Sequence, residues 1–355
     1  MLEKYVHKGE KTSGTRTRRC IYFLFVCLMM GTLMFAFYNA NYQVSWSFGA
    51  WTSSSWQTSS DTNMTTVYSD LHGSVDSEYP VTYPYNSRFL LDEPDRCRQE
   101  SPFLVLMIPV APHNKEARDA IRKTWGKETM VLGRVVSHYF LLGRTKEEDS
   151  SDPLEQEILE ESQQHHDLLQ SDFLDCYKNL TIKTMVMFKW LSTHCPNTSY
   201  GMKVDSDMFL NVHNLVNMLL EAPLHLYMTG MVVKGAHVIR DNTSKWYMPH
   251  SAFSESIYPP YTMGLGYVFS LDLPKKIVEA SVHVEAVYIE DVYVGLCLRH
   301  LGIALTDPPN SHLFRTSMPY TVSNCYWTSV ITTILDSAGQ LLDIWEKYRT
   351  AVGNC

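Results

Sequence analysis

The stretch YGMKVDSDMF, residues 200–209, decides the fold and points to one site. Its first five residues predict a short buried strand, which ends at Asp205-Ser206-Asp207. Two carboxylates two residues apart on an extended backbone point the same way, and two like charges at a strand end are costly unless a cation neutralises them. Oxygen ligands of this kind suit Mg²⁺ or Mn²⁺, which bridge protein carboxylates to a diphosphate. The alternative interpretation is an exposed acidic turn.

Strands and helices alternate around this stretch. The apolar run 103–110 predicts a strand buried on both faces, and residues 135–142 predict another. Helices are predicted from Lys115, from Pro153 to about residue 170, and over about 177–193. The alternation predicts an α/β domain, a Rossmann-like mainly parallel sheet with helices on both faces. Ligands of such sheets lie beyond the carboxyl ends of strands, where Asp205 and Asp207 stand. Because no G-x-G-x-x-G or Walker A stretch occurs, a dinucleotide enzyme or P-loop protein is not expected.

The N-terminus predicts a membrane anchor. Residues 20–38 carry no charge, and a helix of that length measures about 28 Å, close to the roughly 30 Å of a hydrocarbon core. Residues 1–19 hold six Lys or Arg against two Glu, a net of 6 − 2 = +4, so the positive-inside rule puts this tail in the cytosol and the rest in the lumen. A cleaved signal peptide is the alternative, but the run exceeds a usual h-region and no small-x-small cleavage site follows closely.

The lumenal part divides into a stem and a domain. Residues 39–93 are rich in Ser, Thr, Tyr and Trp, with no Lys or Arg before Arg88, and predict a stem, although their aromatic residues fit the membrane interface as well. Residues 94–355 suffice for one α/β domain. The formal charge of −8 leaves −12 after the +4 of the tail, which argues against a nucleic-acid partner.

Cysteines and glycosylation sequons agree with an oxidising lumen. Six cysteines follow the predicted span, which suggests disulfides whose connectivity the sequence leaves open. None has the short C-x-x-C spacing of a zinc site. Asn-x-Ser/Thr sequons stand at Asn63, Asn179, Asn197 and Asn242.

Several other residues are candidates for ligand contacts. Arg118 and Arg122 lie four apart on one helix face, where guanidinium groups suit phosphate oxygens, or else they are solvated or pair with nearby acidic residues such as Asp119. Trp246 and Tyr247 offer an apolar platform for a sugar ring, or else belong to the core.

Two further pairs carry similar alternatives. Gly264 and Gly266 permit close approach of the backbone to a ligand, unless they serve only a loop turn. Glu290 and Asp291 precede an apolar helical run. A carboxylate there either caps the helix or accepts a proton as a general base.

Five segments, taken in order and spacing, closely resemble the β-1,3-galactosyltransferase and β-1,3-N-acetylglucosaminyltransferase family of the Golgi. The resemblance covers roughly residues 94–355. The segments are RDAIRKTWG (118–126), DFLDCYKNLTIKT (172–184), KVDSDMFLN (203–211), YPPYTMGLGYVFS (258–270) and EDVYVGLCL (290–298).

The resemblance implies a GT-A fold, a UDP-sugar donor, Mn²⁺ and inversion at the anomeric carbon, in a Golgi membrane protein that glycosylates a protein or lipid. By matching the family motif, Asp207 with Asp205 near it would hold the metal, Asp291 would be the general base, and Glu290 would orient it or bind the acceptor. The form of the last segment favours UDP-galactose over UDP-N-acetylglucosamine. A pseudoenzyme or glycan-binding partner is the alternative from another class. The sequence leaves the acceptor glycan undetermined, and an oligomer is compatible with it.

One position departs from the family. Relatives commonly carry a histidine in an Ile-Thr-x-His segment near the C-terminus, where it is thought to complete the metal site. The matching position here is Ile334, within ITTILDSAGQLLDIW (331–345). Because an aliphatic side chain has no lone pair to offer, weaker metal binding and low or acceptor-restricted activity are expected.

Overall fold

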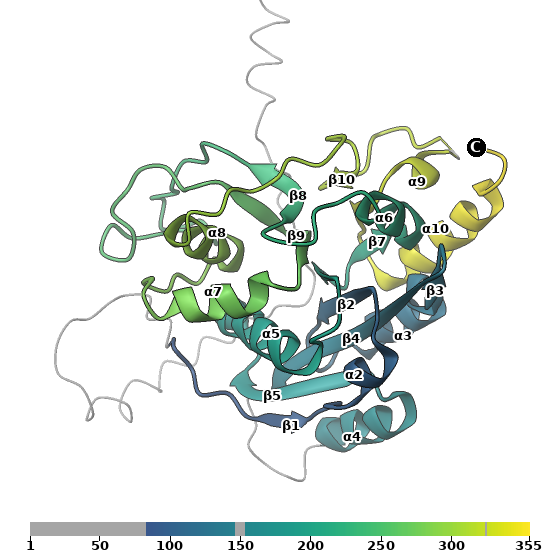
Figure 1. Cartoon of the computed structure of the whole chain (residues 1–355), viewed down its shortest axis with the longest axis horizontal. Coiled ribbons are helices and arrows are strands. Elements are labelled where there is room, and N and C mark those ends of the chain that lie inside the picture. The colour runs from purple at the N-terminus through teal and green to yellow at the C-terminus, as the bar shows by residue number, and fades with distance from the viewer. Residues whose placement is uncertain (1–82, 146–152, 324) are drawn as a thin grey trace, which may run out of the picture. The chain divides into compact units, whose positions relative to one another are not determined.

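The computed structural model describes residues 83–145, 153–323 and 325–355, which belong to the compact unit Val75–Cys355 (Figure 1). The predicted tail and span (1–38) and most of the predicted stem lie outside the described residues. Within the ranges described, no helix is long and apolar enough to cross a membrane.

The fold is mixed α/β, built on one large sheet and one small one. The large sheet has the order β1-β5-β4-β2-β6-β9-β8, with β3 paired to β4, and the small sheet has the order β10-β11-β7. The strands are β1 (Phe89–Leu91), β2 (Leu104–Pro109), β3 (Met130–Val131), β4 (Arg134–Arg144), β5 (Leu168–Leu174), β6 (Tyr200–Val204), β7 (Met208–Leu210), β8 (Met228–Val233), β9 (Tyr261–Ser270), β10 (Phe314–Arg315) and β11 (Thr332–Ile334).

Helices connect these strands, and several begin at a capping side chain. Asn114, Asn211 and Ser337 each accept a hydrogen bond from the amide three residues on, which satisfies a donor that the first helical turn leaves free. The helices are α2 (Arg96–Glu100), α3 (Lys115–Lys123), α4 (Pro153–His165), α5 (Leu180–His194), α6 (Val212–Leu219), α7 (Leu273–Ser281), α8 (Glu290–His300), α9 (Tyr326–Ser329) and α10 (Ala338–Ala351), with 3₁₀ turns η1 (Trp125–Lys127) and η2 (Tyr177–Asn179).

The large sheet is mixed, so the expectation of a mainly parallel sheet holds only for its centre. Strands β5, β4, β2 and β6 run parallel to one another. Strand β1 pairs antiparallel with β5, β9 pairs antiparallel with β6, and β8 pairs antiparallel with β9. The alternation of strands and helices was read from residues 103–204, which form the parallel part. Since β1 belongs to the sheet, the sheet begins before the predicted domain boundary at residue 94.

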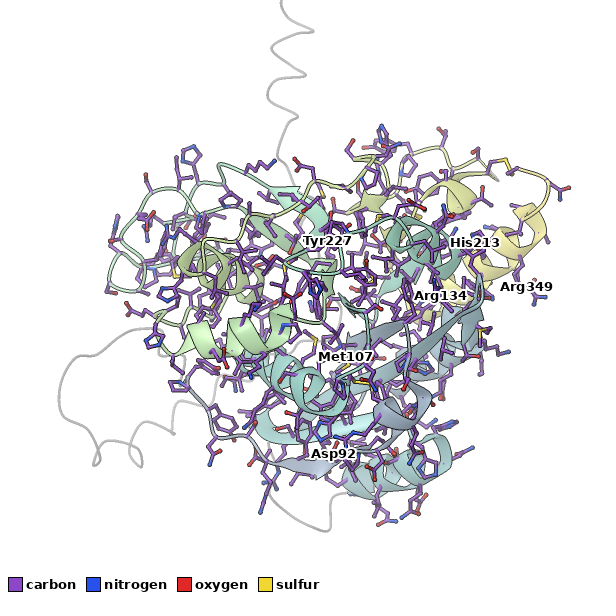
Figure 2. All side chains as sticks on the ribbon, in the orientation of Figure 1. Asp92, Met107, Arg134, His213, Tyr227 and Arg349 are labelled. Atoms are coloured by element: carbon purple, nitrogen blue, oxygen red, sulfur yellow. A yellow bond between two sulfur atoms is a disulfide. The ribbon has the colours of Figure 1, made fainter. Side chains whose placement is uncertain are left out.

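Helices cover both faces of the large sheet, as predicted. Along β2, Leu104, Leu106 and Ile108 pack into one apolar core with α3, α6 and α10, whereas Val105 and Met107 pack into the other with α5, α7 and α8. This division follows from the two-residue period of a strand. Met107 lies near the middle of the molecule (Figure 2) and is fully buried.

Two elements differ from their prediction. The helix that begins at Pro153 ends at His165 rather than near residue 170, because His166 adopts a left-handed φ of 51° and Leu168 begins β5. Gly264 and Gly266 lie within β9 and not in a loop. Polar residues in β5 and glycines in β9 interrupt the apolar pattern from which a buried strand is predicted.

Two disulfides resolve the open question of cysteine pairing. Cys97 on α2 pairs with Cys195 at the end of α5, and Cys325 pairs with Cys355 beyond α10. Cys176 and Cys297 carry free thiols. The second bridge ties the C-terminus to the α9 region, close to the small sheet that contains β7 and β11.

Candidate active site

Asp205 and Asp207 follow the last residue of β6, as predicted. The Asp205 amide donates to the carbonyl of Leu265 at 3.0 Å, and the carbonyl of Asp207 accepts from Leu335 at 2.8 Å, so both ends of the acidic turn are fixed. Asp207 is exposed on one side. The protein packed around its other side and the neighbouring Asp205 charge raise the pKa of Asp207 to about 6. The turn therefore presents closely spaced carboxylates that repel each other.

Lys203 connects this turn to a second acidic pair. Its Nζ lies 2.6 Å from Asp205 Oδ1 and 3.0 Å from Glu290 Oε1, and it also donates to the carbonyl of Gly264. Although burial works against its charge, the carboxylates of Asp205 and Glu290 raise the pKa of Lys203, so the ammonium stays protonated. Sequence reasoning gave Lys203 no role. The available signal was a lysine in an apolar strand, two residues before Asp205 and thus on the same face.

Glu290 and Asp291 open α8, but their environments differ. Glu290 is 6% exposed, and its Oε2 accepts from Thr184 at 3.2 Å and Tyr267 at 3.4 Å. Burial raises the pKa of Glu290 to about 7, against the opposing effect of Lys203. Asp291 is half-buried and pairs with no basic side chain in the described ranges.

Backbone amides hold the Asp291 carboxylate. Gly264 donates to Oδ2 at 2.9 Å and Val292 donates to Oδ1 at 2.8 Å. Burial raises the pKa of Asp291, while the two amides favour the charged form. The N-cap of α8 is Ile289, with no side-chain cap, so Asp291 serves the first turn of the helix without capping it. One carboxylate is thus locked by a cation, and the other is held only by amides.

An aromatic cluster lies beside this acidic pair. Lys245 Nζ stands 4.5 Å from the ring centroid of Trp246 and 5.9 Å from that of Tyr177, and both rings are exposed, by 39% and 45%. Tyr288 OH donates to the carbonyl of Lys245 at 3.0 Å, which anchors this loop two residues before α8. Close packing and the charge of Asp291 raise the pKa of Tyr177 to about 12. Trp246 is therefore a surface residue and not part of the core.

The galactosyltransferase family model matches residues 116–309, a range that contains both acidic pairs, Lys203 and the aromatic cluster. β-1,3-Galactosyltransferase 1 of Mus musculus is 41% identical over 266 residues, which cover 74% of this chain and 78% of the relative. The chain belongs to the galactosyltransferase family. The resemblance seen in the five sequence segments is thereby confirmed.

Longer relatives match this chain as well. β-1,3-Galactosyltransferase 2 of Pongo abelii and of Homo sapiens are each 40% identical over 283 residues, 78% of this chain. The match spans 66% of the length of those relatives. A solved glycosyltransferase involved in glycosylation of the major capsid of PBCV-1 aligns with a TM-score of 0.37 and 11% identity, over 69% of this chain and 99% of its own. That superposition is too loose to support any statement about the site.

Arg118 and Arg122 lie in a buried ionic network and make no contact with the acidic residues of the site. Arg118, 1% exposed, binds both oxygens of Glu161, at 2.8 and 2.7 Å. Arg122 binds both oxygens of Asp167, at 2.8 and 2.7 Å, and also Asp119 at 3.0 Å. Of the anticipated neighbouring partners only Asp119 is used, and the main partners come from α4 and the start of β5. A role in donor binding would require these pairs to open.

Ile334 lies beside the acidic turn, as its place in the family segment implies. It pairs with Met208 across the antiparallel β11–β7 ladder, and the next residue, Leu335, donates to the carbonyl of Asp207 at 2.8 Å. The structure therefore brings Ile334 next to the acidic turn, where the predicted metal site lies.

The donor set of the acidic turn fits a hard divalent cation such as Mn²⁺, provided that ligands other than protein complete the shell. No group of three His, Cys, Asp or Glu side chains arranged to hold a metal occurs in the ranges described. Asp207 forms no ion pair within those ranges, whereas one oxygen of Asp205 is taken by Lys203. Carboxylate oxygens with open positions suit a cation that also binds a diphosphate and water.

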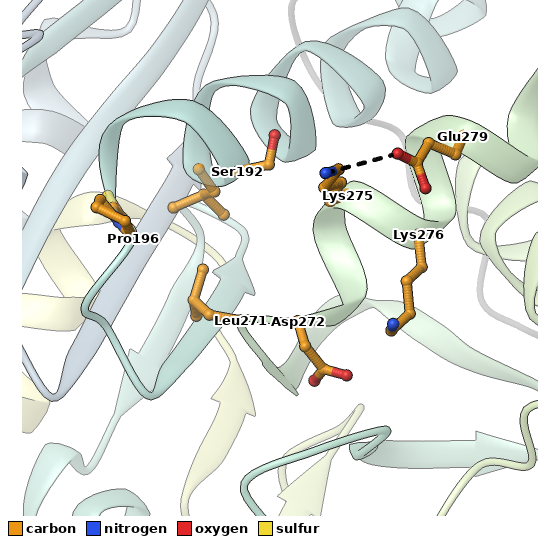
Figure 3. Close-up of a pocket in the computed structure, with 9 residues that line it drawn as sticks. Ser192, Pro196, Leu271, Asp272, Lys275, Lys276 and Glu279 are labelled. Atoms are coloured by element: carbon orange, nitrogen blue, oxygen red, sulfur yellow. Dashed lines mark ion pairs between the residues drawn. The ribbon is translucent and has the colours of Figure 1, made fainter.

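A separate cavity of about 440 Å³ lies between the end of α5 and the start of α7 (Figure 3). Lys275 and Glu279 on its wall are 3.9 Å apart, an exposed ion pair. Leu191 and Cys195, which line the cavity, lie at the C-terminal end of α5. Thr184, which donates to Glu290, lies near the N-terminal end of that helix. It therefore does not belong to the acidic site.

Proposed function

We propose that this galactosyltransferase moves galactose from UDP-galactose to the 3-hydroxyl of an acceptor sugar, forming a β-1,3 linkage. Support comes from relatives named β-1,3-galactosyltransferase at 40–41% identity. The observation that carries the proposal is Asp291, a carboxylate without a cationic partner in the described ranges, held by the Gly264 amide beside the turn of Asp205 and Asp207.

Asp291 acts as the general base. It takes the proton of the acceptor 3-hydroxyl while that oxygen forms a bond to the anomeric carbon of galactose. The bond between this carbon and the diphosphate oxygen breaks, and UDP leaves with the electron pair. Attack from the face opposite UDP inverts the configuration. A positioned carboxylate contributes about 10²- to 10⁴-fold to such a proton transfer.

Asp207, with Asp205 beside it, would hold Mn²⁺ on the donor diphosphate. The cation would neutralise charge that builds on the departing UDP. Gly264 and Gly266, which the sequence offered as ligand contacts, are not part of this proposal: a Cβ on Gly264 would meet Glu290 Oε1 at 2.7 Å and one on Gly266 would meet Met202 Cε at 3.3 Å, so protein fills the space beside both. Arg118 and Arg122 are not part of this proposal, because Glu161 and Asp167 occupy their guanidinium groups.

Trp246 and Tyr177 would form the platform on which the acceptor sugar packs. Both side chains are exposed, and Tyr288, two residues before α8, contacts the Tyr177 ring and donates to the Lys245 carbonyl next to Trp246. Aromatic faces of this kind bury the apolar face of a sugar ring. Lys245 now covers part of both faces, so it would move when the acceptor binds.

The cellular setting follows from the predicted anchor. A type II, single-pass protein with residues 20–38 in the Golgi membrane would act in the lumen on glycans of glycoproteins or glycolipids. Sequons at Asn197 and Asn242 lie at exposed positions, which supports lumenal passage.

A donor screen tests the proposed activity. The purified full chain is incubated with Mn²⁺, a panel of acceptor sugars, and either UDP-galactose or UDP-N-acetylglucosamine. Release of UDP and a β-1,3-linked product with UDP-galactose alone is the expected result. Preference for UDP-N-acetylglucosamine would show that this sugar nucleotide, and not UDP-galactose, is the donor. Release from neither donor would favour the non-catalytic alternative, to which Ile334 points.

A further inference from the structure

The contacts of Lys203 are concentrated on the acidic site. Its ammonium donates to Asp205 Oδ1 at 2.6 Å and to the Gly264 carbonyl, and it forms an ion pair with Glu290 Oε1 at 3.0 Å. Lys203 is 5% exposed and Glu290 is 6% exposed, so water cannot readily replace either partner. A buried ammonium thus joins the metal-binding turn to the start of α8.

We propose that Lys203 and Glu290 form a positioning pair, which sets the separation between the carboxylate of Asp205 and that of Asp291. The proposal rests on the function proposed above for Asp291. Neither member of the pair touches donor or acceptor. Both act through the residues to which they are bound.

Glu290 is suited to this role because its carboxylate is buried, with Oε2 accepting two hydrogen bonds and Oε1 held only by the charge of Lys203. Lys203 lies beside Oε1, while Thr184 from α5 and Tyr267 from β9 donate to Oε2. A carboxylate enclosed from three elements has no face left for an acceptor hydroxyl. Of the two roles that the sequence allowed for Glu290, orientation of Asp291 fits the structure, and direct binding of the acceptor does not.

The backbone of Gly264 connects Lys203 to Asp291. Its carbonyl accepts from Lys203, and its amide donates to Asp291 Oδ2 at 2.9 Å. The same strand is held to the acidic turn by the bond from the Asp205 amide to the Leu265 carbonyl at 3.0 Å. Movement of Lys203 would therefore shift both the metal-binding turn and the base. A misplacement of about 1 Å at a reacting group costs about 10²-fold in rate.

Three variants of the full chain test the pair: Lys203→Met, Glu290→Gln, and both together. Lys203→Met leaves the buried Glu290 carboxylate without a cation, and we expect its melting temperature to fall by about 10 °C; Glu290→Gln leaves Lys203 paired with Asp205 and should lose less. The double variant removes both charges and should recover most of that loss. Turnover, measured as UDP release well below the melting temperature, should fall about 100-fold in all three. The KM for the acceptor should change less than about threefold, since neither residue contacts it.

Asp167→Asn is the control. Asp167 likewise belongs to a buried ion pair and is 3% exposed, but its oxygens bind Arg122 at 2.8 and 2.7 Å, in a network that does not contact the acidic residues of the site. We expect a similar loss of melting temperature with turnover within a few-fold of the parent.

Recovery of turnover together with melting temperature in the double variant would show that the pair only stabilises the fold. A raised acceptor KM with unchanged turnover in Glu290→Gln would make Glu290 an acceptor ligand. Either result overturns the proposal, as does full turnover in Lys203→Met. A parent inactive with every donor would instead overturn the proposed function and, with it, this inference.

Discussion

The amide of Gly264 donates to Asp291 Oδ2 at 2.9 Å, so β9 and the start of α8 are in direct contact. A Cβ placed on Gly264 would lie 2.7 Å from Glu290 Oε1 and 3.4 Å from Asp291 Oδ2. Glycine at this position is thus required by the close approach of two carboxylates to a strand, and no turn is involved.

Gly264→Ala is therefore expected to reduce turnover about 10²-fold, because the added methyl group pushes Glu290 and Asp291 away from β9. Gly266→Ala is the comparison on the same strand. Its Cβ would meet Met202 Cε at 3.3 Å, the end of a flexible side chain, and we expect a smaller loss. Steady-state kinetics on both variants check this. Equal losses would mean that contact with the carboxylates is not what requires glycine.

Asp291→Asn should abolish transfer while leaving the fold and UDP binding nearly intact. The amide keeps the shape of the side chain but cannot take the acceptor proton, a loss of about 10²- to 10⁴-fold. Turnover and Mn²⁺-dependent UDP binding are measured on the same preparation. Near-full turnover would reduce Asp291 to a residue that stabilises the first turn of α8.

The parallel centre of the sheet was predictable because β2, β4 and β6 are apolar runs, buried on both faces, with helices between them. β9 was not, since Gly264 and Gly266 make it resemble a loop. Gly264 is explained by Glu290 and Asp291, which approach from α8, whereas Gly266 faces Met202 on the neighbouring strand. A strand whose composition is set by its neighbours cannot be recognised from its own sequence.

The residues of the site also divide into those that the sequence predicts and those that it does not. Asp205 and Asp207 stand at a predictable strand end, and Asp291 lies in a segment with family resemblance. The partners of Arg118 and Lys203 were not predictable, because Glu161 and Glu290 are distant along the chain and meet them only in the folded structure. A phosphate-binding arginine and a buried structural arginine have the same local sequence.

Asp207→Ala should remove Mn²⁺-dependent UDP binding. Among the described residues, Asp207 is the carboxylate of the acidic turn that no basic group neutralises, so its loss leaves only the partly engaged Asp205 to hold a cation. Calorimetry with UDP and Mn²⁺ measures this, with binding without Mn²⁺ as the control. Equal affinity in variant and parent would remove Asp207 from the metal site.

Stability should fall in acid because of the network around Arg122. Although burial disfavours its charge, the hydrogen bonds and charge of Arg122 lower the pKa of Asp167 well below its ordinary value. A carboxyl whose folded pKa is depressed stabilises the protein above the unfolded pKa, near 3.8, and loses that contribution as pH falls below it. Asp167→Asn should cost about 3 kcal/mol at pH 7 and flatten the decline below about pH 4. Urea unfolding across this range checks both. An equally steep decline in the variant would place the acid sensitivity elsewhere.

Ile334→His should strengthen Mn²⁺-dependent UDP binding or raise turnover. Ile334 pairs with Met208, and its neighbour Leu335 donates to the carbonyl of Asp207 at 2.8 Å. An imidazole at position 334 would therefore lie opposite the residue that follows the acidic turn. Imidazole binds divalent metals beside carboxylates, and the described residues offer no third metal-binding side chain. We expect the Mn²⁺ concentration for half-maximal UDP binding to fall about tenfold. Ile334→Phe, which adds a ring without a nitrogen, is the control and should give no gain. If the histidine variant changes neither quantity while the parent is fully active at low Mn²⁺, position 334 does not correspond to the family histidine.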